Sequence, residues 1–365
     1  MTMKHVIPGC YKNFVCTADA CRKNCCSDGW DIEVDHDTLE LYSRLEKDVS
    51  GPLFSALREV DGVCCFKTSG GSCIWLDEKG LCGIYREYGP EYQSDVCRLF
   101  PRFSEYFGDV KESGIGLGCE EAARIIFSED DPFELFEEEL DEEACWDDEY
   151  DAEIADLVMG LRKDLMKTVL DRDTPCTEKM LAILDRCHQM QAELNSGSEK
   201  IRENTGDISL YKALGRIYES LDNFPDKRPE LEAALMRMNK LLEKADEGIF
   251  KESLINLGKS HRDEDYGRFL AYMLYRYLGK AVFDRNIEDK AKLIVVFLII
   301  LRMQDAVFFT ENDEMTLDDR INIAEMISRE IEYSEDSMEC LYEDLIFEDV
   351  YRYEDLRNLI IMLGD

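Results

Sequence analysis

Residues 292–301 read KLIVVFLIIL, the one strongly apolar run in a chain of 365 residues. Its apolar part, Leu293 to Leu301, is nine residues long, which is far too short to span a bilayer. The run has no polar face, and a helix that is apolar all round is buried on every side. We therefore expect this stretch to lie in the central helix of a bundle.

Amphipathic helices are expected around that central helix. Apolar residues recur at spacings of three and four positions, which is the pattern of a helix with one buried face. Proline-containing and Gly/Ser-rich stretches separate the periodic segments and end the helices. No internal repeat and no alternation of strand with helix is visible, so the expected fold is mainly α. The clearest periodic segments are residues 154–165, 180–187 and 231–241.

The chain changes character near residue 125, where a glycine- and aromatic-rich part with short elements gives way to the helical pattern. The boundary is acidic: residues 129–156 hold 16 Asp or Glu, and no basic residue follows until Arg162. Apolar anchors such as Phe133 and Trp146 favour an amphipathic helix or a docked strap over a free tail. The predicted organisation is a small irregular cysteine-rich metal-binding region (1–127), an acidic connecting segment (128–160) and an α-helical domain (161–365).

The charge balance excludes one class of partner. The chain carries 43 Lys and Arg against 80 Asp and Glu, a net charge of −37. Nucleic-acid-binding proteins present a basic face to phosphates, so we expect no nucleic-acid partner. The acidic surface favours solubility and is compatible with a lysine-bearing partner. No membrane segment and no signal-peptide pattern is visible, and we expect a cytoplasmic protein whose thiols stay reduced.

Eleven of the 15 cysteines fall within residues 10–119. Thiolates gathered by glycine-rich loops in a reducing compartment typically hold a soft metal or an iron–sulfur cluster. Cys10, Cys64, Cys65 and the four distal cysteines are instead interpreted as small buried hydrophobic residues. The predicted metal ligands are Cys16, Cys21, Cys25, Cys26, Cys73, Cys82, Cys97 and Cys119.

The spacing of these cysteines leaves the metal open. Zinc ribbons use closely spaced cysteine pairs at both ends of the site, and only the first group, Cys16 to Cys26, approaches that pattern. The later cysteines are far apart, which suits a [4Fe–4S] cluster enclosed by several loops. Zn²⁺ remains the alternative.

Four stretches resemble one known family. CTADACRKNCCSDGWDIEVDHDTLELY (16–42), LDEKGLCGIYREYG (76–89), CRLFPRF (97–103) and CEEAARI (119–125) are similar to the flagellin lysine N-methylases and, more remotely, to the cysteine-rich zinc- or iron-chelating domain family. The resemblance implies a protein-lysine N-methyltransferase with a [4Fe–4S] cluster, which transfers methyl groups from S-adenosylmethionine to lysines of flagellin or a similar surface protein. The alternative is a non-enzymatic zinc- or iron-binding protein with a helical interaction domain.

A methyl donor needs cationic or polar groups for its carboxylate. Arg268, Tyr272 and Arg276 follow one another at helical i, i+4 spacing in a segment similar to the aromatic-rich helix of the methylases. This stripe either receives the donor carboxylate or pairs with Glu and Asp of a neighbouring helix. The glycines of GIGLG (114–118) imitate the loop of a Rossmann-type methyltransferase, but no apolar strand is evident before them, so we interpret them as a flexible approach to Cys119.

The catalytic residues are not singled out by the sequence. Lysine must lose a proton before it attacks the methyl group, and the ordinary pKa of its side chain is about 10.4. A carboxylate or tyrosine beside the cysteine loops would guide the ammonium group into the site. Asp28, Asp31, Tyr85 and Tyr88 lie there, and each is equally compatible with an ordinary surface position.

Overall fold

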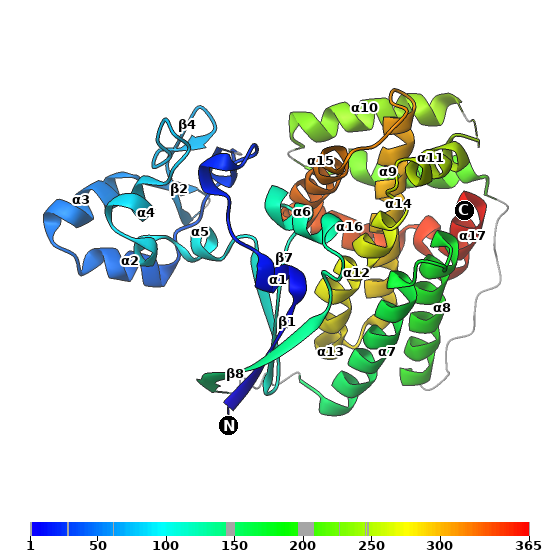
Figure 1. Cartoon of the computed structure of the whole chain (residues 1–365), viewed down its shortest axis with the longest axis horizontal. Coiled ribbons are helices and arrows are strands. Elements are labelled where there is room, and N and C mark those ends of the chain that lie inside the picture. Colours follow the sequence, from blue (N-terminus) through cyan, green and yellow to red (C-terminus); the bar gives the residue numbers. More distant parts are fainter. Residues whose placement is uncertain are drawn as a thin grey trace.

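The computed structural model describes residues 2–27, 29–60, 62–143, 150–195, 208–225, 227–244, 246 and 248–364. Helices dominate it, as the expected mainly α class requires, and short strands are confined to the first 143 residues. Figure 1 shows a small N-terminal unit on one side, a helical domain on the other and a narrow sheet between them.

The N-terminal unit consists of short elements joined by turns, where η marks a 3₁₀ or π turn. Two hairpins, β2–β3 and β4–β5, and four of the five short helices, α2 to α5, surround a small core that includes Tyr42, Leu53 and Phe66. The elements are α1 (Gly9–Asn13), η1 (Ala18–Ala20), η2 (Cys25–Ser27), α2 (His36–Ser43), α3 (Lys47–Ser55), β2 (Leu57–Val60), β3 (Val63–Phe66), β4 (Thr68–Ser69), β5 (Ser72–Cys73), α4 (Gly83–Glu87), η3 (Pro90–Tyr92) and α5 (Asp95–Leu99).

A four-stranded sheet in the order β6-β7-β1-β8 connects the two parts. The central pair β1–β7 is parallel, and both outer pairs are antiparallel. The acidic segment supplies the edge strand β8, and charged side chains on an edge discourage pairing with other chains. The His5 ring lies between Ser113 (2.9 Å) and Glu138 (2.8 Å) and so joins three of the strands. The strands are β1 (Thr2–Pro8), β6 (Arg102–Phe107), β7 (Val110–Ile115) and β8 (Leu135–Glu143).

The helical domain follows α6 (Glu120–Ser128), which leads from the sheet onto its surface. The three periodic segments of the sequence lie in α7, α8 and α10, so those helix predictions are confirmed; α7 continues through residue 160, where the predicted division falls. The helices are α7 (Ala152–Leu170), α8 (Cys176–Leu194), α9 (Leu210–Asp222), α10 (Pro229–Lys244), α11 (Gly248–Lys259), α12 (Asp265–Tyr277), η4 (Leu278–Lys280), α13 (Ala281–Asp284), α14 (Ile287–Phe309), α15 (Leu317–Ile327), η5 (Ser328–Glu332), α16 (Glu335–Phe347), η6 (Asp349–Tyr351) and α17 (Tyr353–Leu363).

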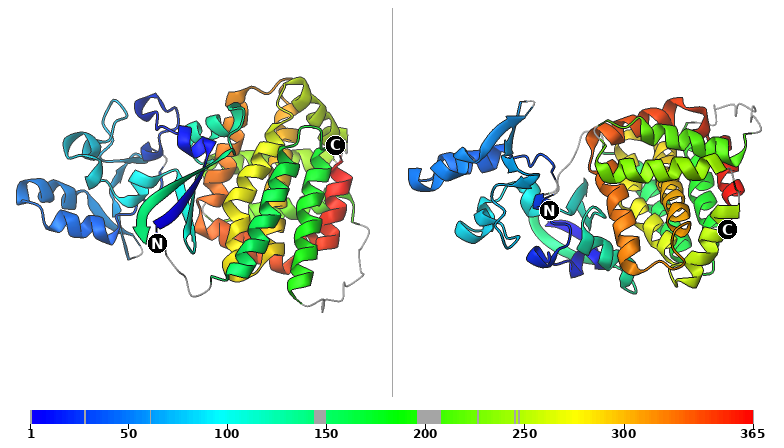
Figure 2. Two further views of the ribbon diagram at one scale, coloured as in Figure 1. Left: turned by 60° about the horizontal axis from the view of Figure 1, so that its bottom comes forward. Right: turned by 90° about the horizontal axis from the view of Figure 1, so that it is seen from above.

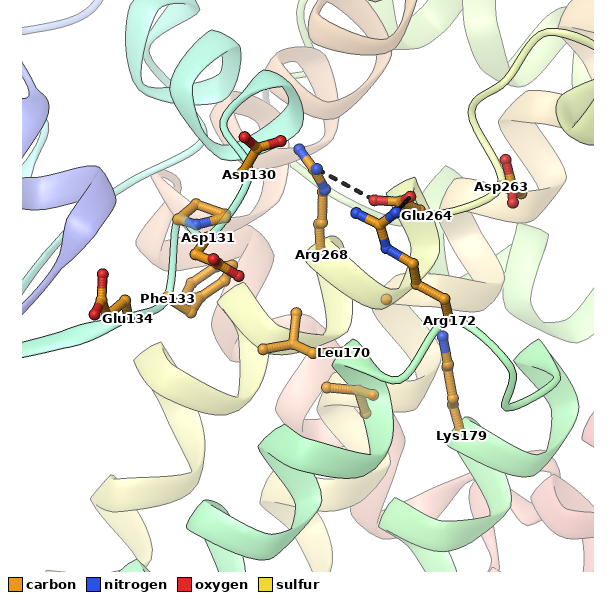
Figure 3. A pocket seen from close by; sticks show the side chains of 13 residues that line it. Asp130, Asp131, Phe133, Glu134, Leu170, Arg172, Lys179, Asp263, Glu264 and Arg268 are labelled. Carbon is orange, nitrogen blue, oxygen red and sulfur yellow. Dashed lines mark hydrogen bonds and ion pairs between the residues drawn. The ribbon is translucent and has the colours of Figure 1, made fainter.

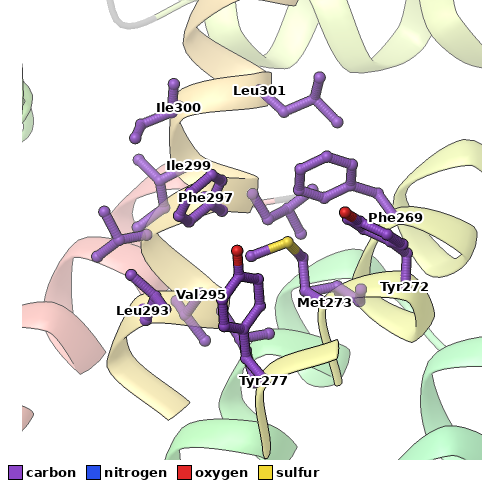
Figure 4. Packing of buried hydrophobic residues seen from close by; sticks show 14 of the residues in the cluster. Phe269, Tyr272, Met273, Tyr277, Leu293, Val295, Phe297, Ile299, Ile300 and Leu301 are labelled. Atoms are coloured by element: carbon purple, nitrogen blue, oxygen red, sulfur yellow. The ribbon is translucent and has the colours of Figure 1, made fainter. Parts of the chain in front are cut away.

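Helix α14 runs through the middle of this domain (Figure 2), and α8, α11 and α12 pack against it. Every residue from Leu293 to Leu301 is buried, which confirms the prediction from the apolar run. Phe269 and Met273 of α12 face Phe297 of α14 across the core (Figure 4). Within the described residues, no helix has the combination of length and apolarity that crossing a membrane requires.

Candidate metal centre

A cavity of about 720 Å³, here called the thiol cavity, lies within the N-terminal region. All eight cysteines that the sequence assigns to metal binding line it, whereas Cys10, Cys64 and Cys65 do not. The lining cysteines come from many short elements: the loop after α1 (Cys16), the end of η1 (Cys21), η2 (Cys25 and Cys26), β5 (Cys73), the starts of α4 (Cys82) and α6 (Cys119), and α5 (Cys97).

Hydrogen bonds of two polar side chains bring the separate cysteine stretches together. The Asp77 carboxylate accepts from the backbone N–H groups of Lys79 (2.8 Å) and Leu81 (2.9 Å) and closes the turn before Cys82. The Asn24 amide donates to the carbonyl of Gly80 at 3.0 Å. Asn24 therefore ties the first cysteine loop to the turn that carries Cys82.

Asp35 anchors the helix that carries Cys97. Its carboxylate caps α2 by accepting from the N–H of Thr38 at 2.8 Å, and it also accepts from the N–H of Asp95 at 2.8 Å. Burial raises the pKa of Asp35, but these hydrogen bonds outweigh burial and hold the pKa below its ordinary value. One ionised side chain thus fixes the start of α5 against α2.

The thiols differ in how readily they ionise. Burial raises the pKa of Cys97 and Cys119 to about 12 and that of Cys21 to about 11. A hydrogen bond from the Cys26 thiol lowers the pKa of Cys25 to about 7, and the nearby Arg329 guanidinium acts in the same direction. Cys25 is therefore the thiol that becomes a thiolate, the form that binds metals, most easily.

The helical domain contributes to the wall of the thiol cavity. Arg329 on η5 lines the cavity, and its Nε donates to the carbonyl of Gly118 at 2.8 Å. Its Nη2 donates to the carbonyl of Lys23 at 3.1 Å, so one side chain holds both the first cysteine loop and the start of α6. On the other side of this junction, Glu120 forms an ion pair with Arg22 at 2.6 Å.

The arrangement of the thiols can be compared with what each metal needs. Four thiolates at about 2.3 Å from one zinc ion stand about 3.8 Å apart. In the described part of the chain, only the exposed side chains of His36, Asp37 and Glu40 form a group of three metal-binding residues with ligand atoms within 4.8 Å of one another. The thiols instead surround a void. An iron–sulfur cube takes thiolates from diverging directions, so this donor set fits a polynuclear iron–sulfur centre better than a single zinc ion.

The three residues predicted for the methyl donor do not share one pocket. Tyr272 is 1% exposed, and its hydroxyl donates to Glu332 at 2.8 Å. Arg276 pairs with the same carboxylate at 3.1 Å and lies against the rings of Phe103 and Tyr333. These two residues therefore pair with an acidic residue near the end of η5, the second of the two roles that the sequence left open.

Arg268 lies further along α12, at a separate pocket of about 380 Å³ (Figure 3). Its guanidinium donates to the carbonyl of Ile126 and pairs with Glu264, both at 3.3 Å. Arg172 and Lys179 line the same pocket together with several carboxylates. This pocket does not include any of the eight thiols.

The glycines of GIGLG are needed for close packing rather than for a nucleotide loop. A Cβ on Gly116 would overlap the Tyr333 hydroxyl and lie 2.8 Å from Nη1 of Arg276, and one on Gly118 would lie 2.7 Å from the Tyr333 ring. A strand, β7, leads into these glycines, but it is not the apolar strand that a Rossmann-type loop follows. That strand is mostly polar, and its only parallel neighbour is β1, so the surrounding sheet is not doubly wound.

The four residues considered for proton transfer are placed differently. Asp28 lies outside the described residues. Asp31 pairs with Arg58, and Tyr88 packs against the rings of Trp75 and Tyr92. Only Tyr85 among the described ones lines the thiol cavity, and it is 58% exposed.

Sequence reasoning missed Arg329, Glu332 and Tyr333. They follow α15 more than 200 residues beyond Cys119 and carry no local pattern that links them to cysteines. The one signal in the sequence is the i, i+4 spacing of Glu325 and Arg329, and such pairs are common on helices. In the structure the two side chains pair at 2.9 Å.

Comparison with known proteins places this architecture in a family. A family model described as the FliB lysine N-methylase C-terminal domain matches residues 162–362. The lysine-N-methylase of Salmonella choleraesuis (strain SC-B67) is 27% identical over 147 residues, which is 36% of this chain and 35% of that protein. The lysine-N-methylase of Salmonella typhimurium (strain LT2) is 26% identical over 140 residues, with the same coverage of 36% and 35%.

A third relative is the flagellar biosynthetic protein FliU of Salmonella muenchen, which is 26% identical over 144 residues, 36% of this chain and 80% of that protein. The matched part spans about a third of the two methylases. No solved structure matches the chain. Because the family model covers more than half of the 365 residues, the chain belongs to the FliB lysine N-methylase family.

Proposed function

We propose that this protein is an iron–sulfur protein-lysine N-methyltransferase that uses S-adenosylmethionine to methylate lysines of flagellin or a similar surface protein. Membership of the family supports the reaction class, and the name of the third relative supports a flagellar substrate. The observation that carries the cofactor assignment is the convergence of eight thiols on one cavity, with Arg329 of the family domain in its wall.

The charge and lining of the site suit a lysine substrate. A net charge of −37 attracts an ε-ammonium group over a distance set by the ionic strength. Trp30, Trp75 and Phe100 make part of the cavity wall apolar. A lysine that loses water there has a lowered pKa and becomes the neutral nucleophile that methyl transfer needs.

The reaction breaks one bond and forms one. The lone pair of the neutral lysine nitrogen attacks the sulfonium methyl carbon, the carbon–sulfur bond breaks, and the sulfur leaves as a neutral thioether. The proton that lysine has lost passes to water or to a group at the cavity. We assign Tyr85 to contact the incoming lysine, because it both lines the cavity and remains exposed.

A thiolate-bound iron–sulfur cluster would supply either a staple for the cysteine loops or a Lewis acid for the amino and carboxylate groups of the methyl donor. The chain's own part is to present thiolates, of which Cys25 ionises most easily. Asn24 and Asp35 hold the loops that present the others.

The deciding experiment uses the full chain purified without oxygen. We expect about four irons per chain or more, binding of S-adenosylmethionine by calorimetry, and methyllysine in flagellin by mass spectrometry. Cys97→Ala should lose iron and activity, whereas Cys64→Ala, whose side chain does not line the cavity, should keep both. Colourless protein that holds zinc and does not bind the donor would instead support a non-enzymatic metal-binding protein. Protein that holds an iron–sulfur cluster but does not bind S-adenosylmethionine would support an electron-transfer protein.

A further inference from the structure

The number of thiols at the cavity exceeds what one centre uses. A [4Fe–4S] cluster or a structural zinc ion takes four protein ligands. Eight cysteines line the thiol cavity, and those that pack against a hydrophobic core are divided between the core of the N-terminal unit and that of the helical domain. Because eight exceeds four, we divide the thiols into separate groups of candidate ligands.

Four of the thiols belong to the core of the N-terminal unit. Cys73 is part of that core, which also contains Tyr42 and Phe66. Cys26, Cys82 and Cys97 pack against it. Strand β5, which carries Cys73, packs directly against η2, which carries Cys26. We call these four the first thiol set: Cys26, Cys73, Cys82 and Cys97.

Backbone and side-chain contacts within the N-terminal unit support this grouping. The N–H of Leu76 donates to the carbonyl of Cys73 at 3.0 Å, and Leu76 pairs with Cys82 in an isolated β-bridge. The side-chain amide of Gln93, two residues before α5, donates to Sγ of Cys82 at 3.9 Å. These contacts bring Cys73, Cys82 and the helix that carries Cys97 into one region.

Three other thiols lie at the junction with the helical domain. Cys119 begins α6 and packs against the large core of that domain. Cys21 lies over the first turn of the same helix, with its Sγ 3.7 Å from Oε2 of Glu120. Arg329 joins the carbonyl of Gly118, the residue before Cys119, to the carbonyl of Lys23, two residues before Cys25, so Cys25 also lies at this junction. We call these three the second thiol set: Cys21, Cys25 and Cys119.

The turn η2 explains how neighbouring cysteines can serve different sets. Successive side chains of a 3₁₀ turn point about 120° apart, so Cys25 and Cys26 diverge from adjacent positions. Cys25 therefore lies at the boundary between the two sets. Cys16 is exposed, where a thiolate stays hydrated, and we assign it to neither set.

We infer that the protein holds two neighbouring thiolate-bound metal centres: a closed centre on the first thiol set, and a three-cysteine centre on the second thiol set at the junction with the helical domain. The inference rests on the proposed thiolate-bound cofactor and not on methyl transfer. Metal sites with four protein ligands are typically structural, whereas sites with three keep a position open to a small ligand. The second centre is therefore the one at which chemistry can occur.

Metal content separates the two centres. The full chain and its variants are purified without oxygen, reconstituted with iron and sulfide or with zinc, and assayed for iron and zinc per chain. Cys73→Ala and Cys97→Ala should each lose the metal of the first centre and keep that of the second. Cys21→Ala and Cys119→Ala should each lose the metal of the second centre and keep that of the first. Combining Cys97→Ala with Cys119→Ala should remove all of it, and Cys16→Ala and Cys64→Ala should keep the wild-type content.

Wild-type protein provides a test that does not depend on the folding of variants. As a chelator removes metal in steps, the newly exposed thiols are alkylated and located by mass spectrometry. The second thiol set should become reactive first and as a group, because its centre has fewer protein ligands, and the first set later as a group.

Three outcomes would overturn the inference: loss of the whole metal content in every single variant, exposure of all seven thiols in one step, or no metal after reconstitution. Metal content reports on the two centres whether or not lysine is methylated. If the protein holds two centres but does not methylate lysine, only the proposed activity is contradicted. If it methylates lysine but holds one centre, only the inference of a second centre is contradicted.

Discussion

The N-terminal unit and the helical domain are held together by different means. The helical domain is built around α14, whose residues from Leu293 to Leu301 are all buried among apolar neighbours. The core of the N-terminal unit has seven buried apolar residues, of which one is a cysteine, and beside it lies a cavity of about 720 Å³ lined by thiols. Burial of apolar area stabilises the helical domain, whereas we propose that the N-terminal unit, with so small a core, depends on a metal bound by its thiols.

The largest expected effect follows from removing the proposed metal. Structural zinc contributes about 10 kcal/mol or more to the folding of small metal-binding domains. We expect that a strong chelator increases amide hydrogen exchange in α4 and α5 and leaves α14 protected, which mass spectrometry of the exchanged peptides can measure. Equal protection of α4 and α5 before and after chelation would show that the small core keeps the N-terminal unit folded without metal.

The next effect tests the helical domain. Phe297 is fully buried in α14 (Figure 4), and Phe297→Ala should lower the free energy of unfolding by about 3–5 kcal/mol, because it leaves a cavity. The control is Phe347→Ala, since Phe347 is 78% exposed and its loss should change stability by less than about 0.5 kcal/mol. Denaturant titration measures both. The metal content of Phe297→Ala should stay at the wild-type value, and a loss would mean that the two parts are not independent.

A third test concerns the junction between the two parts. Gly116→Ala should cost about 1–3 kcal/mol, because the added methyl group would overlap the Tyr333 hydroxyl in a packed site. Gly160→Ala is the matched control: that glycine lies inside α7 with nothing within 4 Å of the added Cβ, so alanine should stabilise by about 0.5–1 kcal/mol. Thermal unfolding of the two variants gives the comparison. If both substitutions change the stability equally, the backbone at Gly116 can move to accommodate the added methyl group at little cost.

The two regions also differ in how far the sequence predicts them. A helix that is buried all round needs only its own apolar residues to be recognised, and α14 was predicted for that reason. Strands β7 and β8 were not predicted, because VKESGI and LFEEELDEE lack the regular apolar alternation of a half-buried strand and acquire their conformation from pairing with β1.

The candidate site shows the same contrast. The density of cysteines along the chain was enough to choose the eight that line one cavity. The role of Arg329 depends on a contact with Lys23 across 306 positions, and no local pattern encodes such a contact. For Arg268, Tyr272 and Arg276, helical spacing correctly placed all three on one helix, but their surroundings are set by the elements packed against it.

The smallest effect concerns the capping carboxylate of Asp35, which belongs to the N-terminal unit alone. Asp35→Asn keeps the shape of the side chain but removes its charge and replaces one of its two accepting oxygens by an NH₂ group, so it should cost about 1 kcal/mol near neutral pH. Hydrogen bonds hold the pKa of Asp35 below its unfolded value, so its stabilising contribution is complete above the unfolded pKa, about 3.9, and is lost as the pH falls through the folded pKa.

The difference in stability between wild type and Asp35→Asn should therefore be constant from neutral pH down to about 5 and shrink below about 4. Denaturant titrations at several pH values, followed by exchange in the peptide that contains α5, measure it. Because Asp35 holds the N–H of Asp95, the loss should appear in α5 and not in α14. A difference that persists at low pH would mean that the loss comes from the amide group of the variant, and that the start of α5 does not depend on the charge of Asp35.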